Sequence, residues 1–117
     1  MKILVCDDES SVRKVLVVML GIDHHQVETA VDGQEALEKI QANSFDVLIT
    51  DLKMPKLSGL ELVGRLRDEK NPLKIIMITG YWDEMDKSQL DRLELNGFLT
   101  KPFKTAELLE CLNALGS

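Results

Sequence analysis

Four of the apolar runs in this sequence end in polar residues that could carry out chemistry. These residues are Asp7 and Asp8 after the first run, Asp51 after the third, Thr79 after the fourth and Lys101 after the fifth. Three carboxylates that meet in one place repel one another unless a cation lies between them. Oxygen ligands without His or Cys nearby favour a hard ion such as Mg²⁺ over zinc. Together with an ammonium and a hydroxyl, such a site indicates phosphoryl transfer, with an acyl phosphate formed on an Asp.

Each of these residues also has an ordinary structural interpretation. An Asp after a strand is often a turn residue or a helix cap, Thr is common in strands, and a Lys in a loop is usually solvated. The chemical interpretation therefore requires that the four strands with these residues at their ends direct them to the same place. This requirement makes the predicted fold part of the functional prediction.

The apolar runs are predicted to be the strands of a parallel sheet. The predicted strands are residues 2–6, 26–31, 45–50, 73–78 and 97–100. The third and fourth runs are almost continuously apolar, as in strands covered on both faces, whereas residues 26–31 alternate like a half-exposed edge strand. Ligands of such sheets bind beyond the carboxyl ends of the strands, which is where the polar residues lie.

Helical periodicity separates the strands. Four of the five predicted helices have a clear apolar stripe: Val12, Val15, Leu16 and Met19; Ala36, Leu37 and Ile40; Leu62, Val63 and Leu66; and Leu108, Cys111, Leu112 and Leu115. The remaining predicted helix, the fourth in the chain at about residues 83–95, is only weakly amphipathic. Gly21 is placed to end the first helix, Asp32 to cap the second, and Ser58 with Glu61 to form a capping box that opens the third. Five strands that alternate with five helices predict an α/β fold with right-handed crossovers and helices on both faces of the sheet.

Length and composition predict one domain over residues 1–117 and a cytoplasmic location. The chain has 117 residues, with 44 % hydrophobic and 29 % charged residues, and no apolar run approaches the length of a membrane span. Its net charge of −6 disfavours direct contact with nucleic acid or an anionic membrane. Cys6 and Cys111 lie in apolar patterns without a partner motif, which predicts buried free thiols.

Five segments of the chain, in order, resemble the receiver domain of two-component response regulators. The segments are LVCDDES, VDGQEAL, FDVLITDLKMPKLSGLELV, IIMITG and GFLTKPF. They extend over the chain from end to end, and together they are far more specific than any one of them alone. The resemblance implies a flavodoxin-like (βα)5 doubly wound parallel sheet with strand order 2-1-3-4-5.

The resemblance also implies a role for each residue at the strand ends. Asp51 is the implied phosphoacceptor, and Mg²⁺ is the implied cofactor. The implied metal ligands are Asp7, Asp8, Asp51 and the backbone carbonyl of Lys53. Thr79 is the hydroxyl that moves to the phosphoryl group on activation, and Lys101 pairs with the phosphoryl oxygens. The Lys101–Pro102 peptide bond is expected to be cis.

The sequence departs from the family at positions that affect switching and phosphoryl lifetime. Phe98 stands where the family often has Tyr, so the ring is kept without its hydroxyl and its coupling to Thr79 is expected to be looser or purely steric. Lys53 and Tyr81 occupy two positions that tune the lifetime of the phosphoryl group. We hypothesise that both disfavour the in-line water and slow self-dephosphorylation. The open alternative is that both are ordinary loop side chains that point into solvent.

A receiver of this kind is expected to act through proteins rather than on a small substrate. Its phosphoryl donor would be a sensor histidine kinase or a histidine phosphotransfer protein, and its output a downstream effector protein bound around the fourth helix, fifth strand and fifth helix. The resemblance implies no enzyme activity beyond the chain's own phosphorylation and dephosphorylation. It allows a monomer or a phosphorylation-linked dimer.

Other classes of function fit the sequence less well than a phosphorylated receiver domain. A hydrolase with an Asp nucleophile would usually carry a second Asp where this chain has Lys53, and a flavodoxin would need a phosphate-binding loop after the first strand. A phosphorylation-independent binding domain has no support, because Asp8, Asp51, Thr79 and Lys101 are all present. The residues leave open whether the protein is a stand-alone regulator or the receiver half of a longer transcriptional regulator whose output domain is absent.

Overall fold

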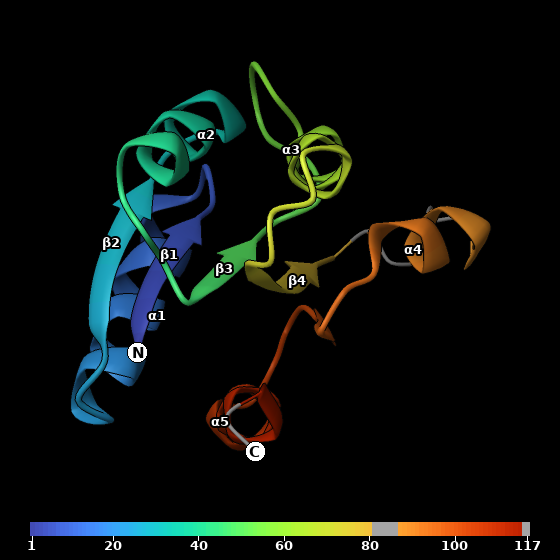
Figure 1. Ribbon diagram of the computed structural model, residues 1–117. Coiled ribbons are helices and arrows are strands. Elements are labelled where there is room, and N and C mark those ends of the chain that lie inside the picture. The colour runs from blue at the N-terminus through green and yellow to red at the C-terminus, as the bar shows by residue number, and fades with distance from the viewer. Residues whose placement is uncertain (81–86, 116–117) are drawn as a thin grey trace.

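A parallel sheet with helices on both faces organises the protein, as predicted (Figure 1). The computed structural model describes residues 1–80 and 87–115, except for the side chains at 87, 89 and 90. Among these residues the strands are β1 (Lys2–Cys6), β2 (Gln26–Ala30), β3 (Val47–Thr50), β4 (Lys74–Thr79) and β5 (Gly97–Thr100). They pair in parallel in the order β2-β1-β3-β4-β5, which confirms the predicted flavodoxin-like arrangement.

The helices divide between the two faces of the sheet. They are α1 (Ser10–Ile22), α2 (Gly33–Ala42), α3 (Gly59–Asp68), α4 (Lys87–Leu93) and α5 (Thr105–Leu115). The strands alternate their side chains between the two cores, so that Ile3 and Val5 of β1 pack with α1 and α5. Leu4 and Cys6 pack with α2, α3 and α4 instead. None of the helices within the described ranges is long and apolar enough to cross a membrane.

The first helix differs from its predicted form in two ways. It continues through Gly21 to Ile22, so the prediction that Gly21 ends it was wrong. The chain instead leaves the helix at His24, which adopts a left-handed φ of 63° and donates its backbone N–H to the Gly21 carbonyl. Val15 is 47 % exposed although it was predicted to face the core. The helix buries Leu16, as predicted, and also Leu20, which the predicted stripe did not include.

The other helices follow their predictions more closely. Ala36, Leu37 and Ile40 in α2, and Leu62, Val63 and Leu66 in α3, are buried as predicted. In α5 the buried residues are Leu108 and Leu112, with Cys111 and Leu115 only partly buried. Both cysteines are free. The fourth predicted helix, at about residues 83–95, corresponds to the shorter α4, and residues 81–86 lie outside the described residues.

Side-chain caps fix the starts of α2 and α3, both of which follow loops at the carboxyl end of the sheet. The Asp32 carboxylate accepts a hydrogen bond from the Glu35 backbone N–H at 2.8 Å. The Ser58 hydroxyl oxygen accepts one from the Glu61 N–H at 3.2 Å. The expected capping box is only half formed, because the Glu61 carboxylate accepts from the Ser58 hydroxyl rather than from its backbone.

Gly59, the first residue of α3, lies directly against the backbone of Asp51. Its N–H donates to the Leu52 carbonyl at 2.8 Å. A Cβ atom at this position would overlap the Asp51 carbonyl oxygen and lie 2.8 Å from the carbonyl carbon. The close approach brings the start of α3 against the residue that follows β3, which only glycine allows.

We expect Gly59→Ala to destabilise the fold by about 2–3 kcal/mol, because the loop after β3 must move to admit the methyl group. Gly64→Ala is the matched control in the same helix, since a Cβ there meets no atom within 4 Å. It should stabilise the fold by about 0.5–1 kcal/mol. Urea unfolding of the two variants measures both values, and equal effects would contradict the close packing at Gly59.

Candidate functional site

Two nearly buried carboxylates and one ammonium meet at the carboxyl end of the sheet. The Lys101 Nζ lies 2.9 Å from Asp51 Oδ2 and 3.1 Å from Asp7 Oδ2. The side chains of both aspartates are 4 % exposed, whereas that of Lys101 is 20 % exposed. Residues from three strand ends that are far apart in the sequence therefore form one charged cluster, as the sequence predicted.

The sheet itself fixes the backbone of these three residues. Each of them directly follows its strand, and each continues the hydrogen bonding of the sheet by one residue. The Asp51 N–H donates to the Cys6 carbonyl at 3.0 Å, and the Lys101 N–H donates to the Thr79 carbonyl at 2.9 Å. The Asp7 N–H donates to the Ala30 carbonyl at 3.2 Å. The charged side chains thus extend from rigid strand ends rather than from loops.

Each carboxylate directs one oxygen at the backbone and the other at Lys101. Asp51 Oδ1 accepts from the Leu52 N–H at 2.7 Å, and Asp7 Oδ1 accepts from the Glu9 N–H at 2.9 Å. These contacts orient both carboxylates so that their second oxygens face the ammonium. The Arg13 guanidinium approaches from α1 and donates to the Asp7 carbonyl oxygen at 2.6 Å.

Burial and charge act in opposite directions in this cluster. Burial raises the pKa of the Asp7 carboxyl above its ordinary value, although hydrogen bonds from Glu9 and Lys101 oppose this effect. Burial alone would lower the pKa of the Lys101 ammonium, but its hydrogen bonds to Asp51 and Asp7 and their charges raise it well above the ordinary value. Lys101 therefore stays protonated, whereas the ionised form of Asp7 reduces the stability of the folded protein.

The cluster extends to two exposed acidic residues and has the donors of a hard-cation site. One carboxylate oxygen from each of Asp7, Asp8, Glu9 and Asp51 lies within 4.8 Å of the others. These oxygen donors carry more negative charge than Lys101 alone can neutralise, so they fit a divalent ion such as Mg²⁺. The sequence prediction missed Glu9. A signal was available, because Glu is an unusual residue at the position before a helix.

A hollow opens beside Asp51 toward solvent. It is lined by Asp8, Glu9, Asp51, Lys53, Met54 and Pro55. Lys53 itself is exposed at this opening. The hollow leaves the nearly buried Asp51 carboxylate accessible from solvent.

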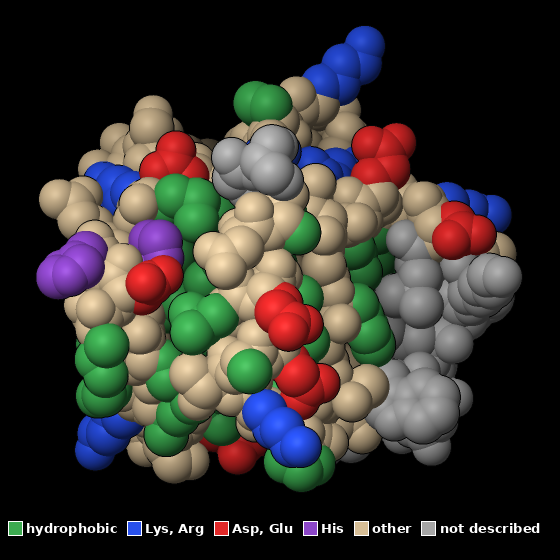
Figure 2. Space-filling model, turned by 90° about the horizontal axis from the view of Figure 1, so that it is seen from below, with side chains coloured by type: hydrophobic (Ala, Val, Ile, Leu, Met, Phe, Trp, Pro, Cys, Tyr) green, Lys and Arg blue, Asp and Glu red, His purple; other side chains and the backbone are tan. Residues whose placement is uncertain are grey.

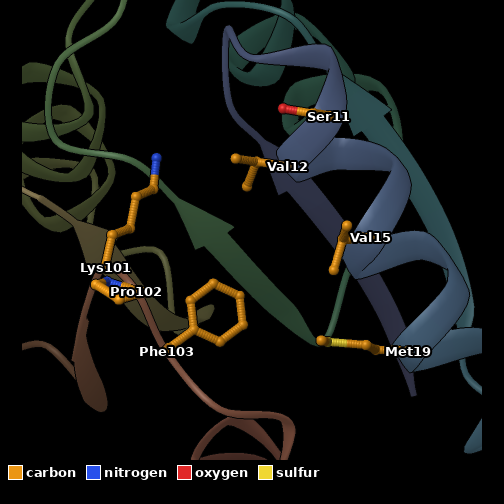
Figure 3. A pocket seen from close by; sticks show the side chains of 7 residues that line it. All are labelled: Ser11, Val12, Val15, Met19, Lys101, Pro102 and Phe103. Atoms are coloured by element: carbon orange, nitrogen blue, oxygen red, sulfur yellow. The ribbon is translucent and has the colours of Figure 1, made fainter.

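A second, apolar groove lies on the other side of Lys101. It runs between α1 and the segment after β5, and Figure 3 shows Val12, Val15 and Met19 on one side and Phe103 on the other. Figure 2 shows the molecule from below relative to the view of Figure 1, and hydrophobic side chains are exposed there among charged ones. The Lys101 stem lines this groove while its ammonium reaches the carboxylates, which is the usual behaviour of a long amphipathic side chain.

The remaining predicted residues occupy different places. Thr79 is the last residue of β4 and is fully buried, one strand from Asp51 and one from Lys101. Phe98 is partly buried against the core on the side of α2, α3 and α4. The Lys101–Pro102 peptide bond is cis. Tyr81 lies outside the described residues.

Comparison with known proteins gives consistent matches over nearly the whole chain. The family model described as "Response regulator receiver domain" matches residues 3–113. The alkaline phosphatase synthesis transcriptional regulatory protein PhoP of Bacillus subtilis is 38 % identical over 107 residues, which is 92 % of this chain and 45 % of that protein. Response regulator RR06 of Streptococcus pneumoniae is 35 % identical over 115 residues, 98 % of this chain and 52 % of that protein. The chain thus spans about half the length of these relatives.

Solved structures are similar over their full length. The chemotaxis protein CheY4 of Vibrio cholerae has a TM-score of 0.88 at 35 % identity, covering 97 % of both chains. The response regulator TrrA of Thermotoga maritima, solved in complex with Mg²⁺-BeF, has a TM-score of 0.87 at 36 % identity, also covering 97 % of both chains.

We expect Asp7→Asn to raise the stability of the metal-free protein at neutral pH, because burial raises the pKa of the Asp7 carboxyl and so disfavours its ionised form. A group whose pKa is raised on folding stabilises the fold only while it is protonated, so the ionised Asp7 destabilises the protein above that pKa. The advantage of the variant should shrink as the pH falls toward the ordinary pKa of Asp, near about 4. Denaturant titrations at several pH values measure it. The exposed Asp68→Asn serves as the control, and an Asp7→Asn variant less stable than wild type at pH 7 would contradict the account.

Proposed function

Because the chain belongs to the response regulator receiver domain family, we propose that it is a phosphorylation-controlled switch whose phosphoacceptor is Asp51. The observation that carries this proposal is the position of the Asp51 carboxylate. It is nearly buried, fixed by the Leu52 N–H, paired with Lys101 and open to solvent through one hollow. A nucleophile held in this way needs little reorganisation before it reacts.

The proposal includes Mg²⁺ as the cofactor. Asp7, Asp8, Asp51 and the backbone carbonyl of Lys53 would hold the ion, in keeping with the grouped oxygen atoms and with the solved Mg²⁺-BeF complex of TrrA. When bound, a divalent ion of this kind neutralises charge on the phosphoryl oxygens during transfer. Lys101 supplies a further positive charge from the protein itself.

The transfer step follows from the residues that surround Asp51. One carboxylate oxygen of Asp51 attacks the phosphorus of the donor, the bond from phosphorus to the donor's leaving atom breaks, and an acyl phosphate forms. The Lys101 ammonium, which already lies against Asp51, then pairs with the new phosphoryl oxygens. With a phosphohistidine donor, the leaving imidazole nitrogen keeps the electron pair of the broken bond.

The new phosphoryl group is proposed to reset the neighbouring strand ends. Thr79 would turn its hydroxyl toward it, and Phe98 on the adjacent β5 would follow by steric contact, since it has no hydroxyl of its own. The change would alter the surface formed by α4, β5 and α5. A charge-driven shift between two packings of this surface is how the signal would pass to a partner.

The partners and the setting of the domain are part of the same proposal. The donor would be a sensor histidine kinase or a histidine phosphotransfer protein, and the output a downstream effector protein. Residues 1–117 would act as one receiver domain in the cytoplasm, as a monomer or a phosphorylation-linked dimer. Since the chain spans about half of its curated relatives, and PhoP is a transcriptional regulatory protein, we favour the receiver half of a longer regulator over a stand-alone protein.

Incubation with acetyl phosphate and Mg²⁺ should add one phosphoryl group to the protein, and Asp51→Asn should abolish the adduct because the amide is not a nucleophile of comparable strength. Intact mass spectrometry measures both. A phosphorylated histidine domain should likewise transfer its group to the wild-type protein and not to the variant. A folded wild-type protein that forms no adduct with either donor would favour a phosphorylation-independent binding domain.

Lys53→Asn should shorten the life of the phosphorylated protein by roughly threefold to tenfold, because the ammonium at the opening of the hollow would no longer pair with the phosphoryl oxygens or obstruct water. Decay of the adduct after removal of the donor measures this rate. Lys56→Asn, in the same loop, is the control. An unchanged decay rate would mean that Lys53 is an ordinary loop side chain, and Tyr81 would then be the remaining candidate for tuning the lifetime.

A further inference from the structure

Glu9 occupies the N-cap position of α1 without capping the helix. Its backbone is extended, with φ of −89° and ψ of 115°, but its side chain accepts no hydrogen bond from the first turn. Ser, Thr, Asp and Asn are the residues that normally cap helices, because their short side chains reach back to the free N–H groups. The first turn of α1 also contains no acidic residue. The α1 helix therefore begins without a side-chain cap, and the Glu9 carboxylate is directed elsewhere.

The Glu9 carboxylate is directed at Lys101. Its Oε1 lies 3.4 Å from Lys101 Nζ, somewhat farther than the oxygens of Asp51 and Asp7. The Glu9 side chain is 59 % exposed, so the contact lies at the open side of the cluster, where Glu9 also lines the hollow over Asp51. The ammonium thus has two buried acceptors and one acceptor that faces the entrance.

Occupation of the site must change the contacts of Lys101. A cation bound to the carboxylates of Asp7 and Asp51 would compete with the ammonium for the oxygens that now accept from it. The aliphatic part of the Lys101 side chain lines the apolar groove beside Pro102 and Phe103. The displaced ammonium would therefore stay within one side-chain length of this groove. Glu9 already lies within that reach.

We propose that Glu9 is a positioning residue for Lys101, holding the ammonium at the entrance of the site while Asp7 and Asp51 bind a cation. The inference rests on the proposed function, because it concerns the same carboxylate cluster. Glu9 keeps the Lys101 ammonium close to Asp51 in the loaded site, where it can pair with an arriving phosphoryl group. The long side chain of Glu serves this role, whereas the shorter Asp would cap α1 instead.

Mg²⁺ affinity in a double-mutant cycle tests this role without measuring phosphorylation. Glu9→Gln should weaken Mg²⁺ binding by roughly threefold, the size of an exposed ion pair. In a Lys101→Met background the same substitution should change the affinity by less than about twofold, because no ammonium remains to be held. Isothermal titration of the four proteins gives the coupling. An equal loss in both backgrounds would mean that Glu9 acts on the cation directly and would overturn the proposal.

The Glu9→Asp variant separates the effect of side-chain length from the effect of the negative charge. It keeps the negative charge, but the carboxylate loses one methylene of reach and becomes a favoured helix cap. We expect it to weaken Mg²⁺ binding as much as Glu9→Gln does, while raising the melting temperature by a few degrees. Unchanged affinity in Glu9→Asp would overturn the proposal, since charge alone would then be sufficient. Failure of the wild-type protein to bind Mg²⁺ at all would contradict the proposed metal site and with it this inference. If Glu9→Gln instead weakens Mg²⁺ binding equally in both backgrounds, only the role of Glu9 is contradicted and the metal site is supported.

Discussion

Two nearly buried carboxylates that are both ionised need positive charge between them, and this constraint organises the rest of the structure. Asp7 and Asp51 directly follow the adjacent strands β1 and β3, so the pairing of these strands brings the two residues together. The balancing ammonium comes from the end of β5, with β4 between it and β3. Strands are about 4.8 Å apart, so the charge must cross nearly 10 Å, and a long flexible side chain such as Lys is suited to that distance. Thr79 ends the strand in between and lies on this path.

The same cluster costs the fold some of its stability. Ionised Asp7 is disfavoured by burial, and Lys101 neutralises only part of the negative charge of Asp7, Asp8, Glu9 and Asp51. The α1 helix starts without a side-chain cap because Glu9 is turned toward Lys101. Such local conflicts are expected where function rather than stability has selected the residues. The rest of the fold is locally consistent, with capped starts to α2 and α3 and two continuous apolar cores.

The apolar runs were sufficient to predict the parallel sheet and the meeting of Asp7, Asp51 and Lys101, because such runs leave little choice of strand and the strand ends must share one edge. The strand order came from the resemblance to the receiver family, and the structure confirms it. It was less informative about α1. Hydrophobic periodicity cannot show which side of an apolar helix faces the sheet, so Val15 was placed in the core although it is largely exposed. Gly21 looked like a helix end, yet His24 takes the left-handed position. For Glu9 the only signal was its unusual place before a helix, because its contact with Lys101 joins residues that are 92 positions apart.

The most direct test of the account is to locate the phosphoryl group itself. Borohydride converts an acyl phosphate of Asp to homoserine, so treating the phosphorylated protein and sequencing its peptides by mass spectrometry identifies the residue that carried the group. The account predicts homoserine at position 51 alone, because Asp51 is the carboxylate held against Lys101 and open to the hollow. Conversion at Asp7 or Asp8 instead, or no conversion in a protein that has gained a phosphoryl group, would contradict it.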